Sequence, residues 1–169
     1  MVVGHFGVGL AFKRVTPQVP LAVLLIAADL LDVLFLVFWL TGIEHCSETS
    51  IVINAWSHGL LMSVFWSVTA GTITFFFSHD RRTSVVMGLL VFSHWVLDFL
   101  AHNPDLPLLF NGSPLVGLSL EWSYTDAGYV IHWAQALIAE FGLLAAGIVI
   151  YLTTRKKRTN APVTAYRTL

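Results

Sequence analysis

The sequence predicts an all-α fold: a polytopic membrane bundle of four transmembrane helices preceded by a short N-terminal half-helix. Of the 169 residues, 56% are hydrophobic and only 11% are charged, whereas soluble domains carry about 25% charged residues. Mean hydropathy is +0.76, and apolar runs are long enough to cross a hydrocarbon core of about 30 Å. The length fits one domain, which we expect to cover residues 1–154, followed by a basic, disordered cytoplasmic tail at 155–169.

Residues 1–12 are apolar but too short to cross a bilayer, so we expect a half-helix that dips into the membrane. Its three glycines allow close packing against neighbouring helices. The positive charges of Lys13 and Arg14 follow this run instead of preceding it, unlike those of a secretory signal. Pro17 and Pro20 then break the chain before the first full span.

Four longer apolar runs are each expected to form one membrane-spanning helix. They cover residues 20–42, 54–77, 84–101 and 127–153. The first span carries Asp29 and Asp32 near its middle, and each carboxylate costs about 2.5–3.5 kcal/mol at a helix centre. Neighbouring apolar residues return about 0.3–0.6 kcal/mol each, so this helix still inserts. Two central acids are nevertheless a burden that a simple membrane anchor would not carry.

The basic residues predict the orientation of these helices. All nine lie in segments that four spans place on one side of the membrane: Lys13, Arg14, Arg81, Arg82, Arg155, Lys156, Lys157, Arg158 and Arg167. The positive-inside rule then puts the N- and C-termini in the cytoplasm and the acidic loops 43–53 and 102–127 outside. Membrane lipids are therefore the expected partners, and the basic tail meets anionic headgroups. The bases form no broad face, so nucleic acid is not expected as a partner.

A polar stripe lies in the third apolar span. His94, Asp98 and His102 follow one another at four-residue steps, which places all three side chains on one face of a helix. Ionisable groups at membrane depth are costly and indicate function, and His and Asp are common ligands of zinc and similar ions. The alternative is that the three side chains pair with one another or line a wet crevice.

Other ionisable residues are expected at the same depth as this stripe. Counting about 1.5 Å per helical residue from the cytoplasmic turns places five of them at about 12–20 Å. These five are His5, Asp29, Asp32, His94 and Asp98. His58 and His102 lie nearer the outer boundary and could close the site from there. Carboxylates and imidazoles gathered in one low-dielectric site repel unless they are neutralised, so we expect a divalent ion, or two.

Five segments, in order over residues 4–107, carry a resemblance to a known family. They are Gly4-His5 with Lys13 soon after, Ala27-Ala28-Asp29-Leu30-Leu31-Asp32, Ser57-His58-Gly59-Leu60, Ser93-His94-Trp95-x2-Asp98-x3-His102 and Asn103-Pro104-Asp105-Leu106-Pro107. With these motifs the chain resembles the bacterial membrane-bound metal-dependent hydrolase-like family, an inner-membrane family distantly similar to zinc-dependent phospholipase C.

The resemblance implies a zinc site built by His and Asp residues from several helices. Carried over motif by motif, its ligands here are His5, Asp29, Asp32, His58, His94, Asp98 and His102. The second His-x3-acid pair of the phospholipases is missing, because His132 is followed by Gln135 and Ala136. We therefore expect one or two ions in place of three. His132 itself is expected at the outer interface, and Glu140 either faces the same site or pairs with a neighbouring group.

The first functional hypothesis is a membrane-embedded metal-dependent hydrolase that acts on a phosphoester, with a lipid phosphoester as the natural substrate. The ion would activate water and polarise a phosphoryl oxygen. Asp32 is assigned to orient or deprotonate that water, and His102 to protonate the leaving group. The loop 102–127, with Asp105 and Glu121, would form the rim of the site.

Two other functions remain open from the sequence. Stacked acids and histidines also suit a proton or divalent-cation transport protein, although the chain is small and shows no inverted repeat. The third hypothesis is a non-catalytic membrane adaptor whose polar layer only holds the bundle together. The metal, the substrate and the oligomeric state are not given by the sequence.

Overall fold

The computed structural model describes residues 1, 3–46, 52–53, 55–110, 112–125 and 128–159, and these form a mostly helical fold, as predicted. The helices are α1 (Gly4–Phe12), α2 (Leu21–Ala28), α3 (Leu30–Leu40), α4 (Leu60–Ser78), α5 (Arg81–Ala101) and α6 (Trp133–Thr159). Short strands pair antiparallel in the connections: β1 (His45–Cys46) with β2 (Val52–Ile53), β3 (Leu106–Pro107) with β4 (Leu115–Val116), and β5 (Trp122–Thr125) with β6 (Gly128–Ile131).

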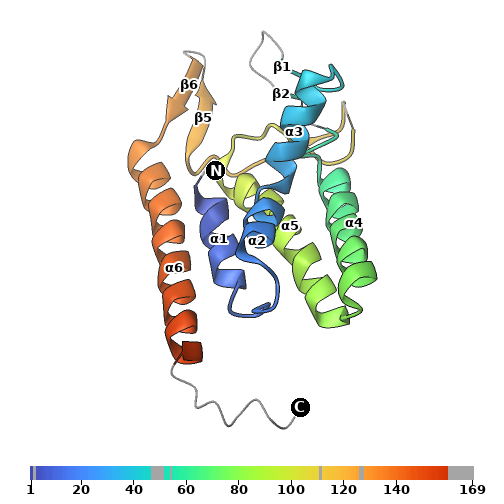
Figure 1. Ribbon diagram of the computed structural model, residues 1–169. Coiled ribbons are helices and arrows are strands. Elements are labelled where there is room, and N and C mark those ends of the chain that lie inside the picture. Colours follow the sequence, from blue (N-terminus) through green and yellow to red (C-terminus); the bar gives the residue numbers. More distant parts are fainter. Residues whose placement is uncertain (2, 47–51, 54, 111, 126–127, 160–169) are drawn as a thin grey trace.

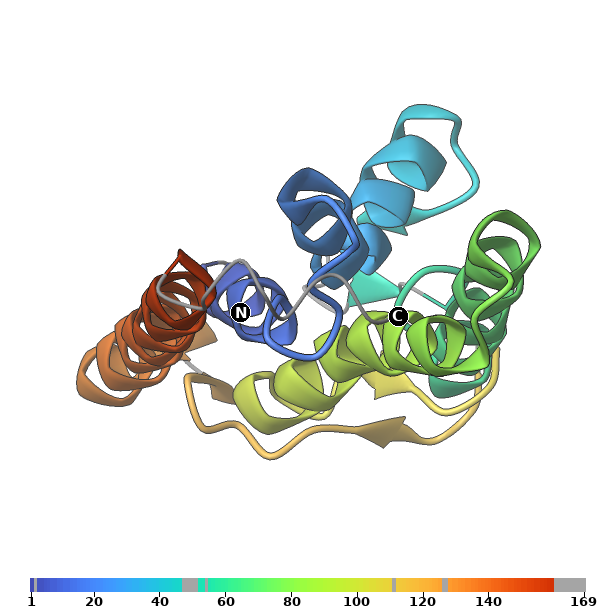
Figure 2. The same cartoon turned by 60° about the horizontal axis from the view of Figure 1, so that its bottom comes forward.

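Figure 1 shows α4 and α6 at opposite edges of the molecule, with α1, α2 and α5 between them. Helix α4 packs along α5, α1 packs between α6 and α2, and α2 also contacts α5. The view in Figure 2 separates the α2–α3 segment from the layer formed by α6, α1 and α5. The buried apolar core lies where α2, α3 and α5 meet, and includes Leu24, Leu31, Leu90 and Val91.

Three helices are long and apolar enough to cross a membrane: Leu60–Ser78, Arg81–Ala101 and Trp133–Lys156. The straight span predicted for residues 20–42 is corrected, because α2 and α3 meet at an angle of 61°. The bend lies at Asp29, whose φ of −107° and ψ of 12° are not helical. Just before it, the Ala28 carbonyl accepts a hydrogen bond from His94 Nδ1 (2.9 Å). A side chain inserted into the backbone ladder is a recognised cause of a helix kink.

The start of α4 also differs from the prediction. The expected span 54–77 begins as a helix only at Leu60, because Gly59 is extended, with φ −60° and ψ 141°. A Cβ on Gly59 would lie 2.5 Å from the Ala55 carbonyl oxygen and 3.0 Å from that of Leu109. The backbones therefore approach closely here, and His58 lies on the turn before the helix instead of within it.

Helix α5 begins three residues earlier than predicted, because Asp80 caps its first turn. The Asp80 carboxylate accepts hydrogen bonds from the amides of Arg82 and Thr83, which would otherwise lack partners. Before it, His79 turns the chain with a left-handed φ of 52°. The sharp α4–α5 hairpin therefore follows from a local cap and a local turn.

The loop predicted for residues 102–127 contains strands, and α6 begins at Trp133 and not at 127. The segment 118–121 runs back along the end of α5, where the amides of Leu118, Leu120 and Glu121 donate to the carbonyls of residues 99, 100 and 101. These carbonyls belong to the last helical turn and have no partner within the helix. The outer segment is thus fixed to the helix that carries the polar stripe.

Helix α6 continues to Thr159, so the tail predicted to be disordered from residue 155 begins as helix, and residues 160–169 lie outside the described part of the chain. Gly7 of α1 and Gly147 of α6 meet backbone to backbone, so that no Cβ fits at Gly147. The start of α1 and the end of α6 lie toward opposite ends of the bundle (Figure 1). The side of the membrane on which each terminus lies stays a prediction.

Candidate metal centre

The Asp98 carboxylate, on the inner face of α5, is the centre of the polar cluster. Its Oδ1 lies 3.2 Å from Nε2 of His5 on α1, and its Oδ2 lies 3.1 Å from Nε2 of His94 and 3.5 Å from Nε2 of His58. All four side chains are buried. Helix α1, the turn before α4 and helix α5 therefore each deliver an imidazole or a carboxylate to one point.

Asp32 supplies a second carboxylate from the first turn of α3. Its Oδ1 lies 3.2 Å from His58 Nε2 and 3.6 Å from His94 Nε2. The Asp32 side chain is 43% exposed, whereas the side chains of His58, His94 and Asp98 are at most 4% exposed. Asp32 thus forms the open wall of the cluster.

Five of the seven ligands predicted from the sequence are brought together. Two groups have ligand atoms that all lie within 4.8 Å of one another: His5, His94 and Asp98 form one, and Asp32, His58 and His94 the other. They share His94, and a single imidazole nitrogen binds one ion. The cluster has the donor types, the separation and the burial needed to hold a metal ion.

His102 and Asp29 lie outside both groups. His102 Nε2 is 3.8 Å from Asp98 Oδ1, and its Nδ1 is 3.5 Å from Asp105 Oδ1, so it lies at the rim on the side of Oδ1. Its side chain is 20% exposed. Asp29 is the residue at which α2 bends into α3, and it belongs to neither group although its carboxyl interacts electrostatically with Asp32 and His94.

Hydrogen bonds fix which nitrogen of His94 carries a proton. Nδ1 lies 2.9 Å from the Ala28 carbonyl oxygen, and a carbonyl only accepts, so Nδ1 must carry the hydrogen. In a neutral imidazole, Nε2 then holds a lone pair. That Nε2 is buried and has no hydrogen-bond partner among the described residues. It faces one oxygen of Asp98 and one of Asp32.

A different set of contacts orients His58 in the same way, with Nδ1 as the hydrogen-bond donor. Ser57 Oγ donates to Glu44 Oε2 (2.8 Å), and the Glu44 Oε1 atom accepts from the amides of Trp56 and Ser57. Because the single Ser57 hydroxyl proton is used in this way, its oxygen accepts from His58 Nδ1, 2.8 Å away. The lone pair of His58 Nε2 is therefore also directed at the Asp32 and Asp98 oxygens.

With both imidazoles neutral, two nitrogen lone pairs and two carboxylates converge, and the 3.2 Å contact of His58 Nε2 with Asp32 Oδ1 is a hydrogen bond only when that nitrogen is protonated. Such an arrangement is repulsive in a buried site unless positive charge lies among the atoms. The Met1 ammonium supplies one charge, 2.8 Å from Asp98 Oδ1. The rest comes either from imidazoles that take up protons and form ion pairs, or from a metal ion held by the cluster. The stacked ring of His5, whose centroid is 3.7 Å from that of His94 at an interplanar angle of 4°, stabilises the orientation of His94 on its other side.

Several groups near the cluster have partners that sequence spacing does not indicate. The Met1 amine lies 2.8 Å from Asp98 Oδ1. Glu140 Oε2 accepts from the Gly4 amide (2.7 Å) at the start of α1, where a helix favours negative charge. Glu121 is buried beside the end of α5, and burial raises the pKa of its carboxyl above the ordinary value. The Met1–Asp98 and Gly4–Glu140 contacts join residues far apart in the chain, so spacing could not predict them. The Ser57–His58 contact joins sequence neighbours, and only this contact had a local sequence signal.

No family model, curated protein or solved structure matches this chain. The resemblance to the membrane-bound hydrolase-like family therefore stays a prediction. The class of site is inferred from its geometry, which is a buried cluster of imidazoles and carboxylates with one open wall.

Proposed function

We propose that this protein is a membrane-embedded, metal-dependent hydrolase that acts on a phosphoester of a lipid. The single observation that carries the proposal is the pair of Nε2 lone pairs on His58 and His94, both directed at the oxygens of Asp32 and Asp98.

Membrane insertion is supported by the outward faces of the long helices. Large apolar side chains point away from the protein on α4 and α6, among them Phe76, which is 70% exposed, and Ile138, which is 74% exposed. Contiguous exposed apolar surface of this extent is unfavourable in water and suits a lipid environment. With the bent α2–α3 pair counted as one span, four spans put every basic turn on one side, which favours the cytoplasmic side of a bacterial inner membrane.

A divalent ion, with zinc as the first choice, is supported by the nitrogen–oxygen distances in the cluster, where the ligand atoms of two three-residue groups lie within 4.8 Å of one another. Zinc holds nitrogen and oxygen ligands at about 2.0–2.2 Å, and tetrahedral geometry then separates neighbouring ligand atoms by about 3.4 Å. The nitrogen–oxygen distances among His58, His94, Asp32 and Asp98 run from 3.1 to 3.6 Å. Direct charge-assisted hydrogen bonds are shorter, at about 2.7–2.9 Å.

When bound, the ion would lower the pKa of water toward neutrality and polarise a phosphoryl oxygen. Asp32, the exposed member of the cluster, orients the attacking water and accepts its proton as the new phosphorus–oxygen bond forms. His102, at the rim beside the other oxygen of Asp98, donates a proton to the leaving alcohol as its bond to phosphorus breaks. Ser57 and Glu44 hold the His58 ring with its Nε2 directed at the cluster.

A lipid substrate is favoured by the apolar rim beside His102. The segment that is hydrogen-bonded to the end of α5 carries Leu118 and Leu120, both more than half exposed. Leu109 and Phe110, on the connection after β3, are also exposed. An ester whose phosphate reaches the cluster could therefore rest its acyl chains on these side chains.

The first experiment measures metal content and hydrolysis on the same preparation. The full chain is purified in detergent without added metal, analysed for bound elements, and assayed for release of phosphate or alcohol from phospholipids. Replacement of His94 by Ala is expected to abolish both the metal content and the activity. Asp32→Asn, a change at a partly exposed side chain, is the second variant in case His94→Ala does not fold. His79→Ala, in the α4–α5 turn, is the matched control and should leave both unchanged.

Two outcomes would overturn the proposal. Wild-type protein that is folded, free of metal and unable to bind added zinc would favour the adaptor hypothesis, in which imidazolium–carboxylate pairs hold the bundle together. Bound metal with no hydrolysis of any phospholipid, together with ion flux in vesicles, would favour transport instead.

A further inference from the structure

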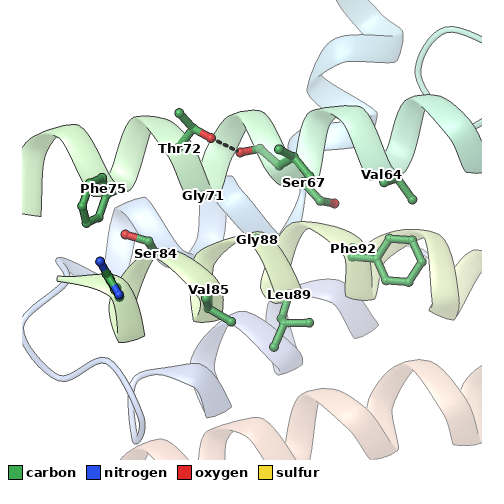
Figure 3. A pocket seen from close by; sticks show the side chains of 12 residues that line it. Val64, Ser67, Gly71, Thr72, Phe75, Ser84, Val85, Gly88, Leu89 and Phe92 are labelled. Carbon is green, nitrogen blue, oxygen red and sulfur yellow. Dashed lines mark hydrogen bonds between the residues drawn. The ribbon is translucent and has the colours of Figure 1, made fainter. Parts of the chain in front are cut away.

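A separate hollow lies between α4 and α5, in the half of the hairpin away from the His/Asp cluster. Its volume is about 590 Å³. Apolar side chains form its walls: Val64, Val68 and Phe75 from α4, and Val85, Leu89 and Phe92 from α5. Figure 3 shows these side chains along the two helices, with Gly71 and Gly88 between them. We refer to this feature as the hairpin groove.

The hairpin groove exists because small residues line the helix crossing. A Cβ on Gly88 would lie 2.9 Å from the Ser67 carbonyl oxygen, and one on Gly71 would lie 3.0 Å from that of Ser84. The two backbones therefore approach closely at the floor, while longer side chains on either side form the walls. This shape is a consequence of glycine and serine positions that repeat at helical spacing on both helices.

The hydroxyl groups of the floor use their donor protons within their own helices. Ser67 Oγ donates to the Ser63 carbonyl (2.6 Å), Ser84 Oγ to that of Asp80 (2.8 Å), and Thr72 Oγ1 to that of Val68 (2.8 Å). Figure 3 shows the Thr72 bond. Because these polar groups are satisfied within their own helices, the groove suits a hydrocarbon chain.

One end of the hairpin groove is charged. Arg81, the first residue of α5, lines the groove at the end marked by Phe75. The neighbouring Asp80 carboxylate is used by the amides of Arg82 and Thr83. Among the described residues, the ion pairs that form involve histidines or the Met1 amine, and none involves Arg81. A guanidinium is thus placed where the apolar groove meets the aqueous boundary.

We propose that the hairpin groove binds one anionic phospholipid, with an acyl chain along the groove and the phosphate at Arg81. From Val64 to Phe75 the groove runs along eleven residues of α4, which is about 16 Å of helix. One leaflet of a hydrocarbon core is about 15 Å thick, so the length matches a chain entering from the Arg81 side. Guanidinium groups bind phosphate with two parallel hydrogen bonds.

A second copy of this chain is a poorer occupant for a physical reason. A two-fold dimer in a membrane has its axis along the membrane normal, so each residue meets its own copy at the same depth. Contact through the hairpin groove would bring two Arg81 side chains together at its edge. Like charges near a low-dielectric surface repel, whereas a phosphate neutralises the charge.

This inference depends on membrane insertion and not on hydrolysis at the His/Asp cluster. The test uses the full chain in detergent, delipidated and titrated with phosphatidylglycerol or phosphatidylcholine, with bound lipid counted by native mass spectrometry. Wild-type protein is expected to bind phosphatidylglycerol about fivefold more tightly, because one Arg near a membrane surface contributes about that factor. Arg81→Gln should remove the preference. Arg82→Gln, the adjacent exposed arginine outside the groove, is the matched control and should keep it.

A third variant tests the groove itself. Leu89 is 57% exposed on the groove wall, so Leu89→Trp is tolerated by the fold but fills the space, and it should reduce binding of both lipids. Equal effects of Arg81→Gln and Arg82→Gln, unchanged binding in Leu89→Trp, or dimers in place of bound lipid would each overturn the proposal. Metal content measured on the same variants should match wild type, so a failure here is distinguishable from a failure at the cluster. A chain that does not associate with vesicles of either lipid would instead show that insertion is wrong.

Discussion

The two halves of α5 differ in where their polar side chains find partners. In the half from Arg81 to Phe92, Ser84 directs its hydroxyl to a carbonyl of its own chain four residues earlier, and Gly88 lets α4 approach closely. In the half from His94 to Ala101, the polar side chains contact each other, with His94 Nε2 3.1 Å from Asp98 Oδ2. They also reach other elements: His94 reaches α2 and α3, and Asp98 reaches α1 and the turn before α4. A hydroxyl that hydrogen-bonds within its own helix leaves the helix surface free to pack closely. A buried imidazole or carboxylate has no such bond to its own helix backbone and needs groups from other elements or an ion.

The largest expected effect is at Asp98, which touches all three inner imidazoles. Asp98→Asn should remove metal binding and lower stability by about 3–5 kcal/mol, because the buried Met1 ammonium and the bound ion then lose their counter-charge. Ser84→Ala in the other half removes one intrahelical hydrogen bond and should leave metal content unchanged. Elemental analysis and thermal unfolding of the two variants in detergent check this. Loss of metal in Ser84→Ala would mean that the two halves are not independent.

In the half from Arg81 to Phe92, a substitution is expected to lower stability without removing metal binding. Gly88→Leu should lower stability by about 1–3 kcal/mol through overpacking against the Ser67 backbone, while the folded fraction still binds metal. Gly142→Ala is the control on α6, because a Cβ there meets nothing within 4 Å, and a better helix former should stabilise by about 1 kcal/mol. Thermal unfolding followed by metal analysis distinguishes them. Parallel loss of metal and stability in Gly88→Leu would contradict the separation of the halves.

A smaller effect on metal affinity is expected at Ser57, which orients His58 without contacting the metal site itself. Ser57→Ala removes the group that accepts the His58 Nδ1 proton and connects it to Glu44. Groups that orient a metal-bound histidine typically account for a 10–100-fold change in affinity, so zinc binding should weaken by about that factor without disappearing. Competition with a chelating dye measures it. Thr69→Ala, which removes only an intrahelical bond on α4, should not alter the affinity; a fall equal to that of Ser57→Ala would point to a general loss of structure.

The smallest effect concerns the cap that starts α5. Hydrogen bonds from Thr83 hold the pKa of the exposed Asp80 carboxyl below its ordinary value. The ionised carboxylate therefore stabilises the fold above that ordinary value of about 4, and this contribution is lost as the pH falls through the lowered pKa. Asp80→Asn keeps a capping oxygen and should flatten this acid dependence, whereas Asp80→Ala should lower stability at neutral pH as well. Unfolding temperatures across the acid range would show whether the three proteins differ in this order.

Local pattern predicted much of the helical organisation. The apolar runs indicated the half-helix at the start and the helices that became α4, α5 and α6, although the boundaries moved wherever a cap or a glycine decided them. The four-residue spacing of His94 and Asp98 placed both on one face of α5, because helical periodicity is a property of the backbone alone. Strands at 45–46, 52–53, 106–107, 115–116, 122–125 and 128–131 were missed, since strands of this length carry little periodic signal.

The sequence by itself determined that the chain is apolar, helical and provided with histidines and aspartates at similar depth. Only the tertiary structure decided that His5, Asp32, His58, His94 and Asp98 meet, that α2 and α3 bend at Asp29, and that Glu44 and Ser57 hold His58 from behind. The physical reason is that spacing along one helix gives the direction of a side chain relative to its neighbours on that helix. The rotation of one helix against another depends on contacts between segments that are far apart in the chain.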